Sequence, residues 1–139
     1  ERCVSRRSGT WQRAPSMRKA RAGPSVAAVD VAGEPHLFVC GGHGTLSFNG
    51  GLESAIVVPS VESFSVASGE WRIVSHMPWP RSLAITMVIG QQIYIMGGAD
   101  DEGEAVASTM RFDAGLCSWD VLEPMAKPRC KAIAAVLSP

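Results

Sequence analysis

Short apolar runs separated by turn residues make up the second half of the chain. Leu83–Ile89 is a seven-residue, largely apolar run that is followed by a turn at Gly90 and then by Ile93–Met96. Two β-rich runs joined by a short glycine-containing turn predict a hairpin, and the first run, apolar on both faces, predicts a strand packed on either side. Thr109–Asp113 and Trp119–Leu122 follow as further strands. This half therefore predicts a four-stranded antiparallel meander.

The first half of the chain repeats this order with longer connections. Its predicted strands are Ser25–Val31, His36–Cys40, Ser60–Val66 and Trp71–Val74. No segment shows a sustained apolar period of 3.6 residues, and 14 glycines and 9 prolines disfavour helices. The pattern predicts an all-β chain built from two copies of one four-stranded unit.

A tryptophan, a methionine six positions later and an arginine four positions after that recur three times. The copies are Trp11–Met17–Arg21, Trp71–Met77–Arg81 and Trp119–Met125–Arg129. Chance would give any one tryptophan both partners with a probability of roughly 0.3 per cent, so the pattern marks an internal repeat. The copies lie 60 and 48 residues apart, a spacing typical of propeller blades and solenoid units.

Two further features recur at matching places. The doublets Gly41–Gly42 and Gly97–Gly98 each follow a short apolar run, and Phe64 and Phe112 each lie seven residues before a tryptophan. The first unit is longer by 12 residues, the difference between spacings of 60 and 48, and the extra residues fall in two places. This predicts fixed strands joined by loops of variable length.

The unit resembles the kelch repeat in its glycine doublet, in the aromatic residue before the tryptophan and in the Trp–Met–Arg spacing. Phe64 and Phe112 stand where that family usually has Tyr, and Glu62 fits its acidic position, from which Met110 departs. The resemblance covers nearly the whole chain and implies the blades of a β-propeller. It also implies that the tryptophans lie between neighbouring sheets and that the methionines and arginines lie in the links between blades.

The resemblance divides the chain out of phase with the blades. Residues 1–20 are expected to end one blade, 21–80 and 81–128 to form two complete blades, and 129–139 to begin a further blade. A propeller needs at least about four blades, so we expect a partial kelch propeller that is not a closed ring, with single strands flanking the two blades. Because its strand edges would lack the missing blades of a parent chain, we expect this segment to aggregate or unfold by itself.

Charge and cysteine content narrow the class of protein. The chain has 13 basic and 13 acidic residues, and although its first 21 positions are basic, no aromatic interleaving there suggests base stacking, so we expect no nucleic-acid partner. No apolar run approaches the roughly 20 residues that span a bilayer, so we expect no membrane partner. His36 and Cys40 lack a second ligand pair, and the four cysteines form no CxxC motif. We expect no metal, no cofactor and a cytoplasmic setting.

The resemblance places two sets of loops on one face of the propeller, where such proteins present residues to another protein. One set is His43–Val58 and Ala99–Ala107, and the other contains the repeated arginines, which are better suited to holding the blade together. Two positions beyond each arginine, where relatives often contact partners, stand Gly23, Leu83 and Lys131. We predict a protein partner at His43, Thr45, Asp100, Asp101 and Lys131.

The loop His43–Val58 is the feature most specific to this chain. Its apolar end, Ala55–Val58, predicts either a hairpin that packs back on the blade or a tongue that binds a partner. We favour packing, because exposed apolar runs are rare. The acidic residues from Asp100 to Glu104 are interpreted as a solvated loop tip.

No catalytic constellation is evident, so we expect no enzyme in this segment. The three histidines lack obvious nucleophile or base partners, and Tyr94, the one tyrosine, lies in a predicted core strand. By resemblance to kelch-like proteins, the propeller would recruit a substrate protein to a cullin-based ubiquitin ligase, with a BTB domain elsewhere. The alternatives are an actin-associated or other cytoskeletal scaffold and a kelch-fold enzyme such as a sugar oxidase or epimerase.

Overall fold

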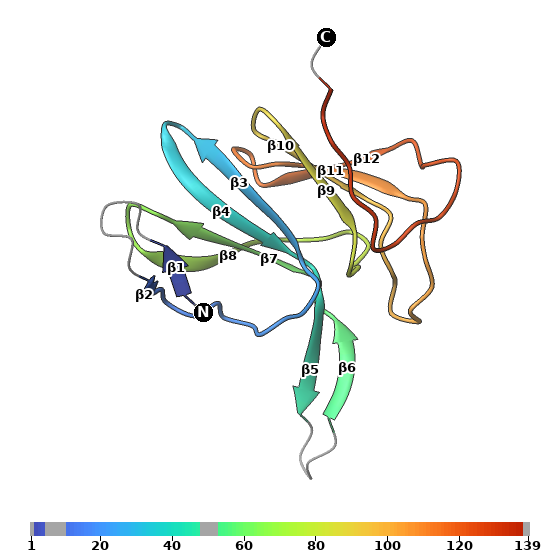
Figure 1. The fold of residues 1–139 in the computed structure, drawn as a ribbon, viewed down its shortest axis with the longest axis horizontal. Coiled ribbons are helices and arrows are strands. Elements are labelled where there is room, and N and C mark those ends of the chain that lie inside the picture. Colours follow the sequence, from blue (N-terminus) through green and yellow to red (C-terminus); the bar gives the residue numbers. More distant parts are fainter. Residues whose placement is uncertain (1, 5–10, 48–52, 138–139) are drawn as a thin grey trace.

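The computed structural model describes residues 2–4, 11–47 and 53–137 (Figure 1). All regular structure in these residues is antiparallel β-sheet, as predicted, and none of them forms a helix. Across the same residues there is accordingly no apolar helix of membrane-spanning length. The sheets lie beside one another without closing into a ring, which confirms the expected partial propeller.

Two four-stranded meanders form the body of the structure. The first blade contains β3 (Ser25–Val31), β4 (Glu34–Cys40), β7 (Ser60–Ser65) and β8 (Glu70–His76). The second blade contains β9 (Ile85–Ile89), β10 (Gln92–Met96), β11 (Thr109–Asp113) and β12 (Ser118–Leu122). Within each sheet every strand pairs with the next in this order, and β3 contacts β9. The predicted meanders are confirmed.

Two hairpins accompany the blades. β1 (Arg2–Val4) pairs with β2 (Trp11–Arg13), and β5 (His43–Ser47) pairs with β6 (Glu53–Val57) between β4 and β7. Figure 1 shows the β5–β6 hairpin projecting from the end of the first blade, away from both sheets. Its base is anchored, because Val57 and Val58 are buried and the Val58 N–H donates to the Gly42 carbonyl at 2.8 Å. Of the apolar end Ala55–Val58, only Val57 and Val58 pack back on the blade as favoured, whereas Ile56 is half-buried and Ala55 is exposed on the hairpin.

Two of the differences between the predicted and the observed strands have a structural cause. The strand predicted at Leu83–Ile89 begins at Ile85, because Leu83 has a φ of 53° and donates its N–H to the Gly23 carbonyl of the first blade at 2.8 Å. Residues 131–137, expected as the first strand of a further blade, are not in a sheet. The described part of the chain offers them no partner strand, and a strand needs one to satisfy its backbone groups.

The core lies between the two blades. The rings of Phe38 and Phe112 meet edge to face, with centroids 5.8 Å apart, and Ile93, Ile95 and Met110 beside them are fully buried. Edge-to-face packing of this kind adds to the free energy gained by burying the rings. The face of one sheet is therefore covered by its neighbour.

Two of the repeated tryptophans pack on matching phenylalanines but differ in their polar contacts, because the buried Trp119 Nε1–H has no hydrogen-bond partner among the described residues. Trp71 packs on Phe64 with ring centroids 5.2 Å apart, and Trp119 packs on Phe112 with centroids 4.8 Å apart. The Trp71 Nε1–H also donates to the carbonyl of Pro15, in the link before its blade, at 3.0 Å. Trp119 packs against the core between the sheets, as the resemblance implies. The side chain of Trp11 lies outside the described residues.

Each glycine doublet makes room for the link that leads to the next blade. The N–H of Gly42 donates to the carbonyl of Arg81 at 3.0 Å, and the N–H of Gly98 donates to that of Arg129 at 2.8 Å. Gly41 has a φ of 66°, and a Cβ built on it would overlap the Arg81 carbonyl oxygen. The doublet is required both by its backbone conformation and by this close approach.

Replacing Gly41 with alanine tests that close approach, with Gly33 as the matched control. Both glycines have positive φ, but a Cβ on Gly33 would meet nothing within 4 Å. We expect Gly41→Ala to lower the free energy of unfolding by roughly 2–5 kcal/mol and Gly33→Ala by about 1–2 kcal/mol. Urea unfolding of the intact protein measures both losses. If they are equal, the packing of the link does not require the absence of a side chain at Gly41.

Candidate protein-binding face

Two of the three repeated arginines, Arg21 and Arg81, bind carbonyls of the blade that follows them. Arg81 donates from Nη1 to the carbonyls of Gly97 and Ser108, both at 2.9 Å, and from Nη2 to Ser108 Oγ at 2.8 Å. Arg21 makes the same set of bonds to Gly41 and Ser60, at 2.8–3.0 Å. These are the contacts of residues that hold a blade together, and they leave the guanidinium groups little capacity for a partner.

The two blades differ in one buried position beside this arginine. In the first blade Glu62 is fully buried, forms an ion pair with Arg21 and accepts the backbone N–H groups of Arg18 at 2.7 Å and Lys19 at 3.1 Å. The matching residue in the second blade is Met110, which is equally buried. Several donors to one carboxylate compensate the cost of burying its charge.

The second blade also lacks one of these donors. Pro78 occupies the position of Arg18 and has no N–H to satisfy, so an apolar side chain at Met110 leaves no orphaned donor there. Arg81, without a carboxylate beside it, relies on carbonyl and hydroxyl oxygens, and burial lowers its pKa. The replacement of the acidic residue by Met110 is therefore accompanied by Pro78 in the link, which removes one of the N–H groups that the acid would have bonded.

A string of backbone hydrogen bonds joins successive links at the end of the innermost strands. The Leu83 N–H donates to the Gly23 carbonyl at 2.8 Å, and the Lys131 N–H donates to the Leu83 carbonyl at 2.9 Å. All three residues have positive φ, between 53° and 59°. Gly23, Leu83 and Lys131, each two positions beyond a repeated arginine, are thus joined in a row by hydrogen bonds that run from one link to the next.

Side chains that the other repeats do not share connect the loops of the two blades on the same face. His43 Nε2 lies 2.7 Å from Ser82 Oγ, and Asp101 Oδ1 accepts the N–H of Val57 at 3.2 Å. The first contact ties the start of β5 to the link before the second blade, and the second ties the end of β6 to the loop after β10. The base of the projecting hairpin is therefore tied to the second blade, while the rest of the hairpin extends away from both sheets (Figure 1).

The five predicted partner-binding residues share this face. His43 and Asp100 are half-buried, whereas Thr45, Asp101 and Lys131 are exposed. The hydrogen bonds described above connect the segments that contain them, from β5 through the links to the loop 99–105. Thr45 lies farther out, paired with Ala55 in the hairpin. The loop tip at Asp100 is an Asx-type turn, in which Oδ1 accepts the N–H groups of Glu102 and Glu104.

Sequence reasoning missed Trp79, which also lies on this face. It is the one tryptophan outside the Trp–Met–Arg repeat, and 47% of its surface is exposed. It lines a groove together with Pro80, Asp100 and Val106. The sequence did contain a signal for Trp79, because this large aromatic residue stands between two prolines at a position where the other repeats have lysine.

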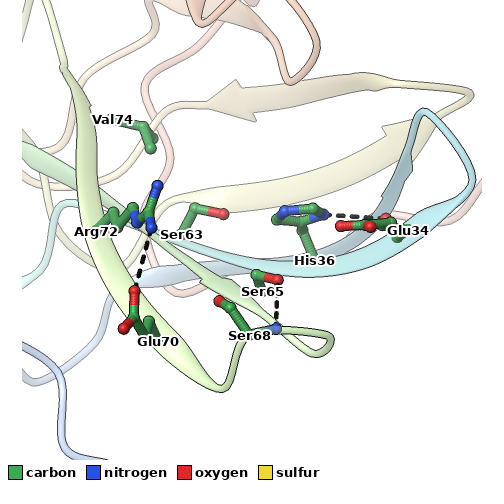
Figure 2. Close-up of a pocket in the computed structure, with 8 residues that line it drawn as sticks. All are labelled: Glu34, His36, Ser63, Ser65, Ser68, Glu70, Arg72 and Val74. Atoms are coloured by element: carbon green, nitrogen blue, oxygen red, sulfur yellow. Dashed lines mark hydrogen bonds and ion pairs between the residues drawn. The ribbon is translucent and has the colours of Figure 1, made fainter.

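A second pocket lies over one face of the first blade's sheet, along β4, β7 and β8 (Figure 2). It measures about 390 Å³ and is lined by polar residues, among them His36, Ser63, Glu70 and Arg72. Glu70 and Arg72 form an exposed ion pair at 3.1 Å, and the His36 Nδ1 bonds the Glu34 carbonyl at 3.0 Å. No group of three or more metal-ligating side chains occurs in the described part of the chain.

No protein-family model matches the chain. Beta-scruin of Limulus polyphemus is 33% identical over 66 residues, which cover 48% of this chain and 7% of the relative. Human kelch-like protein 33 is 30% identical over 87 residues, which cover 62% of this chain and 16% of the relative. Kelch repeat and BTB domain-containing protein 12 of Danio rerio is 28% identical over 88 residues, which cover 56% of this chain and 14% of the relative. The chain spans only a small part of each relative.

The solved structure of YjhT has a similar fold. It superposes with a TM-score of 0.67 over 84% of this chain and 42% of its own, at 15% sequence identity. At this identity the likeness concerns the arrangement of the strands alone. The two four-stranded meanders thus match the blades of a larger protein of known structure.

A double-mutant cycle tests the coupling between Glu62 and the backbone of Arg18. Glu62→Met should cost about 3–5 kcal/mol of unfolding free energy, because it leaves Arg21 and two N–H groups without their acceptor. Arg18→Pro should cost about 1.5–3 kcal/mol beside Glu62 and much less beside the methionine. Any strain from proline is the same in both backgrounds and cancels.

Urea unfolding of the four proteins gives the coupling energy. Arg18→Ala, which removes the side chain but keeps the N–H, is the matched control and should show little coupling to Glu62→Met. Additive effects of Arg18→Pro and Glu62→Met would contradict the assignment of that N–H as a partner of the carboxylate.

Proposed function

Because this chain is built of kelch-type propeller blades, we propose that it belongs to a propeller that captures a protein partner on the face formed by the β5–β6 hairpin, the loop 99–108 and the links between blades. The contact between His43 and Ser82 is the observation that carries the proposal. Ala99 stands at the position of His43 in the second blade, and Ala22 and Cys130 stand at that of Ser82. The other repeats stack without such a pair. Because His43 and Ser82 lie together on the face that carries the loops, the pair supports the proposal that a protein partner is recognised on that face.

The finer proposal is that the captured protein is presented to a cullin-based ubiquitin ligase. Two of the relatives support it by their names, one as a kelch-like protein and one as a protein with kelch repeats and a BTB domain. Cys40, Cys117 and Cys130 are free thiols, which suits a reducing compartment such as the cytoplasm.

The experiment uses charge changes on the proposed face of the intact protein. Thr45→Arg combined with Lys131→Glu alters two exposed side chains without touching the arginines or glycines of the repeat. Partners captured from cells by the unaltered protein should be lost by this variant, because bulk and reversed charge oppose docking. Ser68→Arg combined with Arg72→Glu, at the other ends of the strands, should retain them.

Two readouts separate the coarse proposal from the fine one. If the face variant keeps every partner while remaining folded, capture on this face is wrong. If capture depends on the face but no cullin copurifies and the partner is not ubiquitinated, the propeller binds protein without serving a ligase.

A further inference from the structure

The groove that contains Trp79 lies between the link after β8 and the loop between β10 and β11. Its volume is about 340 Å³, and the described residues that line it are Trp79, Pro80, Arg81, Asp100, Val106 and Ser108. Its two walls come from two described segments of this chain. It opens on the face proposed to bind a protein partner.

Trp79 is held in place without being required by the fold. Pro78 and Pro80 restrict the backbone on either side of it, and its carbonyl accepts the Arg81 Nε–H at 3.2 Å. The equivalent residues before the other repeated arginines are Lys19 and Lys127, so the blade link is made equally well without an aromatic side chain. An exposed indole on rigid backbone is the kind of anchor that dominates protein interfaces.

The charge around the groove is negative. Asp100 lines the groove, and its Oδ1 is fixed by the N–H groups of Glu102 at 3.1 Å and Glu104 at 2.9 Å. Glu102 and Glu104 are themselves exposed, as is Asp101. The basic residue of the lining, Arg81, is only 3% exposed and its guanidinium is engaged by carbonyl and hydroxyl oxygens. An apolar, aromatic floor beside an oriented carboxylate is complementary to a cation with a flat apolar face.

We propose that this groove binds an arginine side chain of the protein partner. The guanidinium would stack on the indole of Trp79 while its N–H groups donate to the carboxylate of Asp100, and the aliphatic stem would lie against Pro80 and Val106. Arginine fits better than lysine, because its planar cation stacks on aromatic rings and bonds carboxylates in a fork. The proposal rests on the proposed function, since it names the chemistry of the partner at that face.

A titration with small cations tests the groove directly. The intact protein is labelled with ¹⁵N-tryptophan, and the indole signal of Trp79 is assigned by its loss in Trp79→Lys. Ethylguanidinium chloride should shift this signal to saturation and ethylammonium chloride should shift it more weakly. Sodium propionate should have no effect beyond that of sodium chloride. An unmoved Trp79 signal, or a preference for propionate, would overturn the proposal.

Substitutions then locate the binding. Asp100→Asn keeps the Oδ1 that closes the turn and removes the charge, so it should weaken ethylguanidinium binding about fivefold. Glu102→Gln, which removes a neighbouring charge outside the lining, is its control and should have a smaller effect. If both change binding equally, the general acidity of the loop is responsible and the assigned contact with Asp100 is wrong.

The partner-capture experiment distinguishes failure of this proposal from failure of the proposed function. Trp79→Lys restores the residue type of the other links and should weaken partner binding about fivefold to thirtyfold. Leu116→Lys, at an exposed turn elsewhere, is the control. If Trp79→Lys keeps the partner while Thr45→Arg with Lys131→Glu loses it, the face binds protein and the arginine pocket is wrong. If neither loses it, the proposed face itself is wrong.

Discussion

The arrangement of the blades depends on one residue that bonds two of them at once. The guanidinium of Arg81 donates to the carbonyls of Gly97 and Ser108 in the second blade, while its own carbonyl accepts the N–H of Gly42 in the first. The glycine doublet is necessary because the Arg81 carbonyl comes so close that a side chain on Gly41 would overlap it. The distance between successive sheets is thereby fixed by polar contacts at one end of the strands, and the apolar side chains between them pack within that spacing.

Within this constraint the buried chemistry can vary, provided that donors and acceptors vary together. The first blade places a carboxylate, Glu62, among an arginine and two backbone N–H groups, and the second blade places Met110 beside a link whose Pro78 lacks one of those donors. A buried polar group is tolerated when it is fully bonded, and its apolar replacement is tolerated when no partner is left behind. The loss of the carboxylate in the second blade is therefore accompanied by the loss of one of its two backbone donors.

Three residues that differ from their counterparts in the other repeats, and that are not needed for stacking the blades, lie on the face formed by the β5–β6 hairpin and the links. His43 and Ser82 join the projecting hairpin to the second blade, and Trp79 lies in a groove on a link where the other copies have lysine. A rigid set of blades keeps such residues in a fixed relation although they come from segments far apart in the chain. This division between repeated scaffold residues and unrepeated surface residues is the physical basis for the proposal that a partner binds on that face.

The sequence by itself determined the strands and the repeat, because apolar runs, turn glycines and recurring anchors at fixed spacing act over a few residues. The resemblance of this repeat to the kelch repeat also implied which loops would share a face. Only the tertiary structure decided that Leu83 leaves its strand to bond Gly23, that Glu62 accepts the backbone of Arg18, and that Trp79 stays exposed beside Asp100. These outcomes depend on contacts between separate segments, up to 60 residues apart from Gly23 to Leu83. No local pattern encodes such contacts, because they exist only once neighbouring blades have stacked.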